Sequence, residues 1–280
     1  MLDELRSLCA GLLRDGTVQV VIGYGLDPDG ESVYPVFITD PDGVACLTWN
    51  SACQQNLVTY LMRPDIRALG RPAVVVKACD ERALVVLQRE NQLREGDVYV
   101  IGVTCDDQHA PQLAKCATCE GRVPRCADSL LGNAAACSAP PAARFSELEE
   151  FLKRSPEERM TFWREELARC TRCYACRQVC PLCYCRLCIV DKNQPVCLDT
   201  SATLKGNFAW QITRAFHLAG RCIGCDECTR ACPAGIDLRL LNLSLSRAAE
   251  EQFGYRAGDK ADSAPVFGAY SEQDQESFIR

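Results

Sequence analysis

Hydrophobic positions in the first hundred residues follow two patterns, helical stripes and short continuous runs. The stripe over residues 2–15 consists of Leu2, Leu5, Leu8, Leu12 and Leu13. Continuous apolar runs at 17–24, 73–77 and 98–103 predict buried strands, and the pattern over 81–95 predicts a helix between the last two. A strand, a helix and a strand at this spacing form a βαβ unit. We therefore expect an α/β domain with a small, mostly parallel sheet and flanking helices.

The stretch after the first run predicts smaller elements. Residues 33–39 and 44–48 have the pattern of two strands, joined by the turn sequence Asp-Pro-Asp-Gly at 40–43. The following stretch has a helical pattern that is interrupted near Pro64.

The second half of the chain has a different composition and hydrophobic pattern. A linker rich in alanine and proline spans residues 130–145, and we place a domain boundary within it near residue 140. Residues 146–169 then have a helical pattern, with a cap at Ser155. Residues 208–218 predict another amphipathic helix. From residue 250 the chain is polar and weakly patterned, which suggests a loose or partner-dependent extension. We expect three parts: an α/β domain at 1–140, an α+β ferredoxin-like domain at 141–249, and a polar tail at 250–280.

The cysteines change this picture, because the chain has 21 of them. Two runs, at 170–180 (run 1) and 222–232 (run 2), have the spacing Cys-x-x-Cys-x-x-Cys-x-x-x-Cys and are each followed by proline. This is the bacterial ferredoxin spacing, in which three thiolates of a run hold one [4Fe–4S] cluster and the fourth ligates the other cluster. Two copies in one chain predict a pair of such clusters.

The ferredoxin rule gives a crossed ligand assignment. Set 1, for the first cluster, consists of Cys170, Cys173, Cys176 and Cys232. Set 2, for the second cluster, consists of Cys222, Cys225, Cys228 and Cys180. Two structural zinc sites would use the same ligand type. The repeated spacing that ends in Cys-Pro argues against zinc.

A third group of cysteines lies in the first domain. Cys79 and Cys105 follow two predicted parallel strands, and sites in open α/β sheets form at the carboxyl ends of strands. Set 3 therefore joins them to a Cys-x-x-Cys pair as a candidate third cluster: Cys79, Cys105, Cys116 and Cys119, with Cys53 and Cys126 in reserve.

The 41-residue spacer between the runs, residues 181–221, is long for a compact ferredoxin and has cysteines of its own. Set 4 consists of Cys183, Cys185, Cys188 and Cys197, whose spacing is irregular. These residues could bind a fourth cluster, donate a substitute ligand to a neighbouring cluster, or form a loop that covers the first cluster. The sequence leaves the three alternatives open.

Composition and charge limit the partners. Hydrophobic residues make up 48% of the chain and charged residues 24%, as in ordinary globular proteins. A net charge of −6 argues against nucleic acid, and no apolar run is long enough for a membrane span. The amino terminus does not have the layout of a signal peptide, so we expect a reducing cytoplasm and protein partners. No residue pattern points to a catalytic nucleophile.

Three stretches resemble a known family. They are WNSACQQNLVTYL, VVVKACDERALVVLQRENQLREGDVYVIGVTC and KCATCEGRVPRCAD. They resemble the beta subunits of coenzyme F420 (deazaflavin) hydrogenases and formate dehydrogenases, over about residues 17–130. The matching positions are Cys79, Arg82, Ala83, Leu84, Gly102, Cys105, Cys116, Cys119, Ala127 and Asp128. The second half resembles dicluster ferredoxins through runs 1 and 2 alone.

The resemblance implies FAD and [4Fe–4S] clusters as cofactors, and electron exchange with a deazaflavin or with partner subunits. In this chain the ferredoxin-like part follows the family-like part, and the first domain is short for a flavin and deazaflavin pocket. This layout favours an electron-transfer subunit with three to four clusters. It would work in a complex built around a flavoprotein, a hydrogenase, a formate dehydrogenase or a heterodisulfide-reductase-like protein. The alternatives are an FAD-dependent oxidoreductase that acts on a soluble deazaflavin or similar acceptor, and a zinc-stabilised scaffold.

Overall fold

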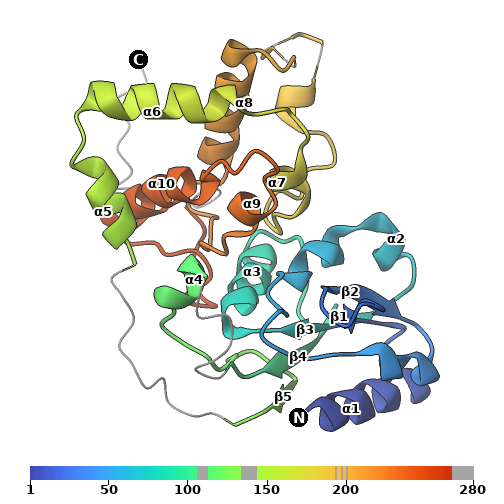
Figure 1. The fold of residues 1–280 in the computed structure, drawn as a ribbon. Coiled ribbons are helices and arrows are strands. Elements are labelled where there is room, and N and C mark those ends of the chain that lie inside the picture. Colours follow the sequence, from blue (N-terminus) through green and yellow to red (C-terminus); the bar gives the residue numbers. More distant parts are fainter. Residues whose placement is uncertain (106–112, 134–143, 193, 197, 200, 267–280) are drawn as a thin grey trace.

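A computed structural model describes residues 1–105, 113–133, 144–192, 194–196, 198–199 and 201–266. The chain forms a sheet half, from the amino terminus to β5, and a helical half that lies against one side of it (Figure 1). No helix in the described ranges is long and apolar enough to cross a membrane.

The sheet half contains five strands in the spatial order β2-β1-β3-β4-β5. Their bounds are β1 Val20–Leu26, β2 Val33–Ile38, β3 Pro72–Val76, β4 Tyr99–Val103 and β5 Ser129–Leu131. Strand β2 pairs antiparallel with β1, and the other neighbours pair in parallel. The predicted α/β domain with a mostly parallel sheet is confirmed. Strands β1, β3 and β4 are buried on both faces, which explains why their sequences are continuous apolar runs.

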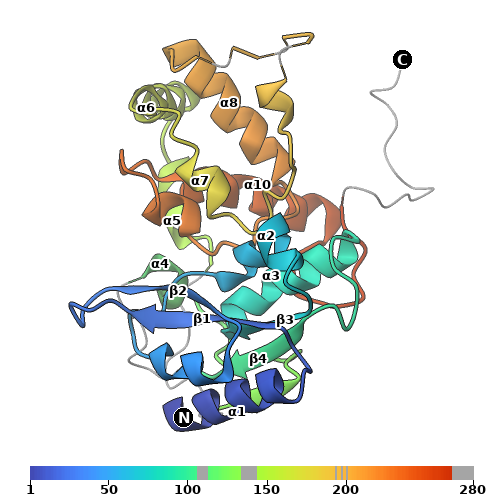
Figure 2. The same ribbon diagram turned by 90° about the vertical axis from the view of Figure 1, so that its right-hand side faces the viewer.

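Helices cover both faces of the sheet (Figure 2). One face carries α1 (Leu2–Arg14), which contacts the 3-10 helix η1 (Pro41–Cys46). The other face carries η2 (Leu57–Met62) and α3 (Ala78–Arg89), with α2 (Pro64–Arg67) beside η2. The helical half lies on this second side (Figure 2).

Two local predictions in the sheet half were wrong. Residues 44–48 do not form a strand: Asp40 caps η1 by accepting a hydrogen bond from the Asp42 amide at 2.9 Å, and only Leu47 bridges to the sheet, at Gly25. The helix expected at 81–95 begins at Ala78, because the Asp80 carboxylate accepts a hydrogen bond from the Lys77 amide at 3.3 Å and caps its first turn. Cys79 therefore lies in the first turn of α3 and not in a loop.

The helical half contains the helix predicted at 208–218, two helices within the predicted stretch 146–169, the unpredicted 16-residue helix α10 and several short helices. Its elements are α5 Ser146–Leu152, α6 Pro156–Ala168, α7 Ala175–Gln178, η3 Ile189–Asp191, α8 Leu204–His217, α9 Glu227–Arg230 and α10 Leu238–Phe253. The expected cap at Ser155 is present, because its hydroxyl accepts from the Glu158 amide at 3.2 Å. Among the described residues from 144 onward there is no strand, so the α+β description of this half is not confirmed.

The hydrophobic core does not stop at the junction between the halves. The largest cluster of buried residues contains the sheet together with Leu182, Leu218, Ile223, Tyr255 and Ala257. The chain after residue 250 is therefore not loose at its start, since α10 continues to Phe253 and the next residues pack against the sheet half. The predicted boundary near residue 140 and the last part of the tail, 267–280, lie outside the described residues.

Candidate metal centres

Runs 1 and 2 fold in the same way. In each run the residue after the second cysteine, Tyr174 or Asp226, adopts the left-handed conformation, with φ of 62° and 65°. A four-residue helix follows at once, α7 in run 1 and α9 in run 2, and it carries the third cysteine of the run. The two helices contact each other, so the cysteines of both runs face a common region.

Set 1 lines one cavity. Cys170, Cys173 and Cys176 come from run 1, and Cys232 reaches the same cavity from the end of run 2. Apolar side chains, including Trp210 and Leu238, complete the wall. The structure thus brings together the four thiols that the crossed assignment joins.

Set 2 lines a second cavity. Cys222, Cys225 and Cys228 come from run 2, and Cys180 comes from the end of run 1. Burial raises the pKa of the Cys228 thiol to about 12. A thiol in this environment keeps its proton at neutral pH unless a cation compensates the charge of the thiolate.

Set 3 lines a third cavity, at the carboxyl ends of β3 and β4. Cys79 lies in the first turn of α3, Cys105 follows β4, and Cys116 lies in the short helix α4 (Ala114–Ala117) with Cys119 just after it. Burial, opposed by the charge of Lys77, raises the pKa of Cys105 to about 12. All four predicted members therefore meet at one site.

Two buried lysines that sequence reasoning missed also line the set 3 cavity, Lys77 and Lys115. The Lys77 ammonium pairs with Asp80 at 2.7 Å, and Lys115 donates to the Gln54 carbonyl at 2.8 Å. Lys115 also lies 3.4 Å from the carboxylate of Glu227, between two cysteines of run 2. Burial opposes the charge of both lysines, but neighbouring thiols and carboxylates raise their pKa values overall. The positive charge of these two ammonium groups would stabilise an anionic group bound by the four thiols of set 3.

The remaining cysteines do not line these cavities. Cys53 is buried in the core of the sheet half, and Cys126 is exposed, so neither reserve residue lies in the set 3 wall. In set 4, Cys183 and Cys185 line a groove of about 870 Å³ at the surface, whereas Cys188 packs in the core of the helical half. Cys197 lies outside the described residues. In the part of the chain that is described, no three Cys, His, Asp or Glu side chains are placed to hold a single metal ion.

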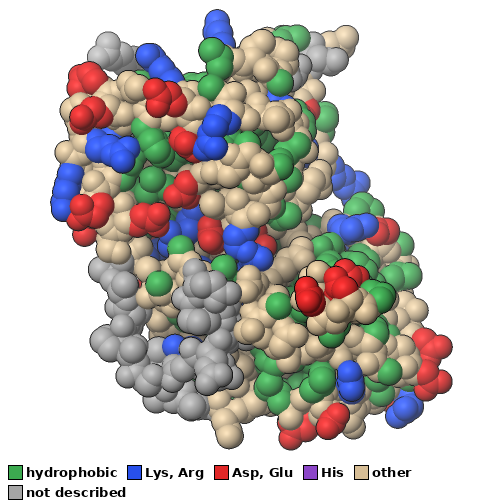
Figure 3. All heavy atoms as spheres, in the orientation of Figure 1, with side chains coloured by type: hydrophobic (Ala, Val, Ile, Leu, Met, Phe, Trp, Pro, Cys, Tyr) green, Lys and Arg blue, Asp and Glu red, His purple; other side chains and the backbone are tan. Residues whose placement is uncertain are grey.

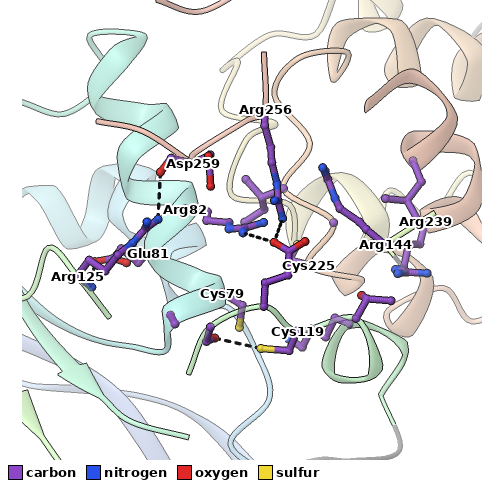
Figure 4. Close-up of a pocket in the computed structure, with 18 of the residues that line it drawn as sticks. Cys79, Glu81, Arg82, Cys119, Arg125, Arg144, Cys225, Arg239, Arg256 and Asp259 are labelled. Atoms are coloured by element: carbon purple, nitrogen blue, oxygen red, sulfur yellow. Dashed lines mark hydrogen bonds and ion pairs between the residues drawn. The ribbon is translucent and has the colours of Figure 1, made fainter. Parts of the chain in front are cut away.

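A fourth cavity, of about 280 Å³, lies where the two halves meet. Its wall includes Cys79 and Cys119 of set 3 on one side and Cys225 of set 2 on the other (Figure 4). Basic side chains dominate the wall: Arg82, Lys115, Arg125, Arg144, Arg239 and Arg256. In Figure 3, lysine and arginine side chains gather along the junction between the halves.

The basic side chains of this cavity exceed its acidic ones. Arg82 and Arg256 both bind the carboxylate of Glu120. Burial and repulsion by Arg256 and Arg82 lower the pKa of Arg144 to about 10. Carboxylates outside the wall balance part of this charge, because Arg144 pairs with Glu250 and Arg239 pairs with Glu147 at 2.7 Å. Guanidinium groups that line a cavity are nevertheless common partners of anionic ligands such as phosphates.

Comparison with known proteins finds sequence similarity to subunits of formate dehydrogenases. No family model matches the chain. It is 23% identical to the F420-dependent formate dehydrogenase subunit beta of Methanocaldococcus jannaschii, over 85% of this chain and 87% of that protein. It is 21% identical to the F420-dependent formate dehydrogenase 1 subunit beta of Methanococcus maripaludis, over 92% of this chain and 90% of that protein. The resemblance to these beta subunits is confirmed, and it extends well beyond residues 17–130 into the second half of the chain.

Proposed function

We propose that this chain is an iron–sulfur electron-transfer subunit of a multi-subunit oxidoreductase complex. The observation that carries the proposal is that three sets of four thiols each line a cavity. Set 3 follows two strand ends, and sets 1 and 2 follow the crossed ferredoxin pattern. Thiolates in this number and spacing are the ligands of [4Fe–4S] clusters, whose chemistry is the uptake and release of single electrons.

The order of the three sets supports a relay. Sets 3 and 2 lie on opposite sides of the basic cavity, and the Lys115–Glu227 contact at 3.4 Å joins their loops. Sets 2 and 1 are joined by the contact between α7 and α9. An electron could therefore cross from the sheet half to the helical half through adjacent sites.

Two amide side chains donate hydrogen bonds to cysteine sulfur atoms of sets 1 and 2, as is common around iron–sulfur clusters. Asn242 donates to the Cys228 sulfur at 3.6 Å, and Gln211 donates to the Cys170 sulfur at 3.7 Å. Hydrogen bonds to ligating sulfur atoms tune the potential of such centres. The chain would bind three clusters through sets 1 to 3, and set 4 stays undecided among the three alternatives.

The relatives support a place in a complex. They are named as beta subunits of F420-dependent formate dehydrogenases, so each works with other subunits. By analogy, the partners of this chain would be redox proteins of the formate dehydrogenase, hydrogenase or heterodisulfide-reductase-like type.

The test is to quantify iron, sulfide and flavin on protein purified without oxygen together with its co-purifying subunits. We expect about twelve iron atoms per chain for three clusters. The protein should be brown and should bleach on reduction. Colourless protein that keeps stoichiometric zinc after anoxic reconstitution with iron and sulfide would refute the proposal and favour a zinc-stabilised scaffold.

A second candidate function is an FAD-dependent oxidoreductase that acts on a soluble deazaflavin or similar acceptor. The basic cavity favours it, because arginines are the usual partners of phosphate groups and this wall also contacts sets 2 and 3. The volume of the cavity argues against bound FAD. It is about 280 Å³, just below the roughly 300–1,000 Å³ that is usual for ligand pockets. It suits a diphosphate better than a whole dinucleotide. We therefore prefer the relay.

Flavin content separates the two candidates. A flavin enzyme should contain nearly one FAD per chain, and the Arg256→Gln variant should lose it. Arg247→Gln is a matched control, because Arg247 pairs with Glu251 on the exposed side of α10 and does not line the cavity. Protein that contains three clusters and no flavin would support the relay alone.

A further inference from the structure

Helix α8 carries a buried polar stripe that its amphipathic pattern did not reveal. Asn207, Gln211 and Arg214 occur at positions i, i+4 and i+7, so they lie on one face of the helix. They are 1%, 2% and 6% exposed. Polar side chains are seldom buried to this degree without a specific partner. The stripe belongs to the long spacer between runs 1 and 2, for which the ferredoxin pattern gives no role.

All three side chains contact run 1. The Asn207 amide donates to the Cys170 carbonyl at 2.6 Å, and the Gln211 amide donates to the Cys170 sulfur at 3.7 Å. The Arg214 guanidinium donates to the Cys176 carbonyl at 2.9 Å. The stripe therefore holds the loop that carries three members of set 1.

Arg214 also reaches set 2. Its side chain lines the set 2 cavity while it is bonded to the backbone of Cys176 from set 1. It therefore lies between the two candidate centres. Asn207 and Gln211, earlier on the same helix face, do not line the set 2 cavity.

Arg214 holds its positive charge beside sulfur atoms. Its side chain lines the set 2 cavity together with Cys180, Cys222, Cys225 and Cys228. The Arg214 Nε atom is buried and has no hydrogen-bond partner among the described residues. A buried cation requires a counter-charge nearby. A cluster held by four thiolates carries net negative charge, and each added electron makes it more negative.

We propose that Arg214 is a positioning residue that provides a shared positive charge for the centres of sets 1 and 2 and raises the reduction potential of both. The inference rests on the proposed function, since it requires clusters at both sets. It gives the spacer a role, because α8 delivers the guanidinium between the two cavities. A positive charge stabilises the reduced, more negative form of each centre, and the low dielectric of the interior strengthens this effect.

The test is an anaerobic redox titration of the iron-loaded protein, followed by electron paramagnetic resonance. Arg214→Gln removes the charge and keeps a polar side chain. We expect its reduction equilibrium to weaken about tenfold at each of the two centres, which is 59 mV for a one-electron couple. Arg214→Lys keeps the charge and should retain most of the wild-type potential. Lys205→Gln is the matched control, because it removes a positive charge from an exposed position on the same helix and should leave both potentials unchanged.

The outcomes separate this inference from the proposed function. Wild-type protein that binds no iron and sulfide at sets 1 and 2 would refute the proposed function. Arg214→Gln protein with wild-type iron content and unchanged potentials would refute the inference alone. If Arg214→Gln does not retain iron, the iron content of Arg214→Lys decides. A wild-type iron content in Arg214→Lys would support the inference, because the positive charge alone then retains the clusters. An iron loss equal to that of Arg214→Gln would overturn it.

Discussion

Lys77 and Asp80 form an ion pair inside the sheet half, with side chains that are 2% and 0% exposed. Lys77 also donates hydrogen bonds to the Tyr24 hydroxyl and, at 3.1 Å, to the Gln55 carbonyl. A buried pair of this kind adds little to the free energy of unfolding when it is compared with an apolar pair of the same size. The loss of one partner is costly, however, because it leaves the other as an isolated buried charge.

We therefore predict that Lys77→Met costs about 3–5 kcal/mol, because it leaves Asp80 without its cation. At roughly 2–4 °C per kcal/mol, the midpoint of thermal unfolding should fall by about 6 °C or more. The double variant Lys77→Met/Asp80→Asn should recover most of this loss, since it removes both charges. Equal losses in the single and double variants would show that the charge imbalance is not the cause.

The crossed arrangement of sets 1 and 2 makes a second prediction. Cys232 follows run 2 in the sequence but lines the cavity of run 1, and Cys180 does the reverse. Cys232→Ala should therefore remove the signal of the first cluster and spare the second, and Cys180→Ala should do the opposite.

Electron paramagnetic resonance of the reduced variants, with iron quantitation, checks this assignment. Cys46→Ala is the control, because Cys46 is exposed and lines none of the three cavities. Loss of the second cluster in Cys232→Ala would mean that each run holds its own four ligands.

The residues that could be predicted from sequence are those with a spacing rule. The cysteines of sets 1 to 3 were found from Cys-x-x-Cys spacing and strand ends, and each set lines one cavity. Lys115 and Arg214 were missed, because a single cation in a helix has no pattern that separates it from a solvated one. Their roles depend on packing between segments far apart in the sequence, which local patterns do not encode.

At the scale of elements, α8 depends on a compact cap at its amino end. The Thr203 hydroxyl accepts from the Gly206 amide at 3.0 Å, and it donates to the Asp199 carboxylate at 2.9 Å. Hydrogen bonds from Ser201 and Thr203 lower the pKa of Asp199 to about 2. The stabilising contribution of the ionised carboxylate is therefore fully present above its ordinary pKa, and it is lost as the pH falls through about 2.

Thr203→Ala should destabilise the protein by about 1 kcal/mol through loss of this cap. Thr203→Ser keeps the hydroxyl and should be close to wild type. The difference between the two variants, measured as the midpoint of thermal unfolding, should be constant between about pH 5 and 8 because Asp199 does not titrate there. A difference that changes across this range would contradict the assigned role of Asp199.

Only some of the long elements were predicted. Strands β1, β3 and β4 and helices α1 and α8 follow from apolar runs and stripes, whereas strand β5 and the 16-residue helix α10 were not predicted. The apolar segment at 44–48 was predicted as a strand, but the cap at Asp40 and the proline after it start a 3-10 helix instead. The strands expected for a ferredoxin fold have no counterpart among the described residues of the helical half, where helix α8 fills much of the space between the runs.

At the scale of the molecule, polar contacts join the halves in addition to the shared core. Glu90, at the end of α3, is 6% exposed and binds Arg221 at 2.6 Å. Glu90 also accepts a hydrogen bond from the Tyr184 hydroxyl. Both partners belong to the spacer between the runs, so a single carboxylate fixes the spacer against the sheet half.

Glu90→Ala should therefore cost about 2 kcal/mol and increase hydrogen exchange in the segments around Tyr184 and Arg221. Glu251→Ala is the control, because its pair with Arg247 at 2.6 Å is largely exposed and such pairs contribute little. Equal effects of the two substitutions would mean that Glu90 has no special role at the junction.

Because each set takes one cysteine from the other run, the crossed arrangement also determines when sets 1 and 2 can be completed during synthesis. Synthesis proceeds from the amino terminus, so Cys170 and Cys180 emerge first and wait for partners that lie more than 40 residues later. Set 2 becomes complete when Cys228 has emerged, and set 1 becomes complete at Cys232, four residues later. Under the proposed function, both sites would therefore become ready for cluster insertion almost together, and a chain truncated before Cys228 would complete neither set.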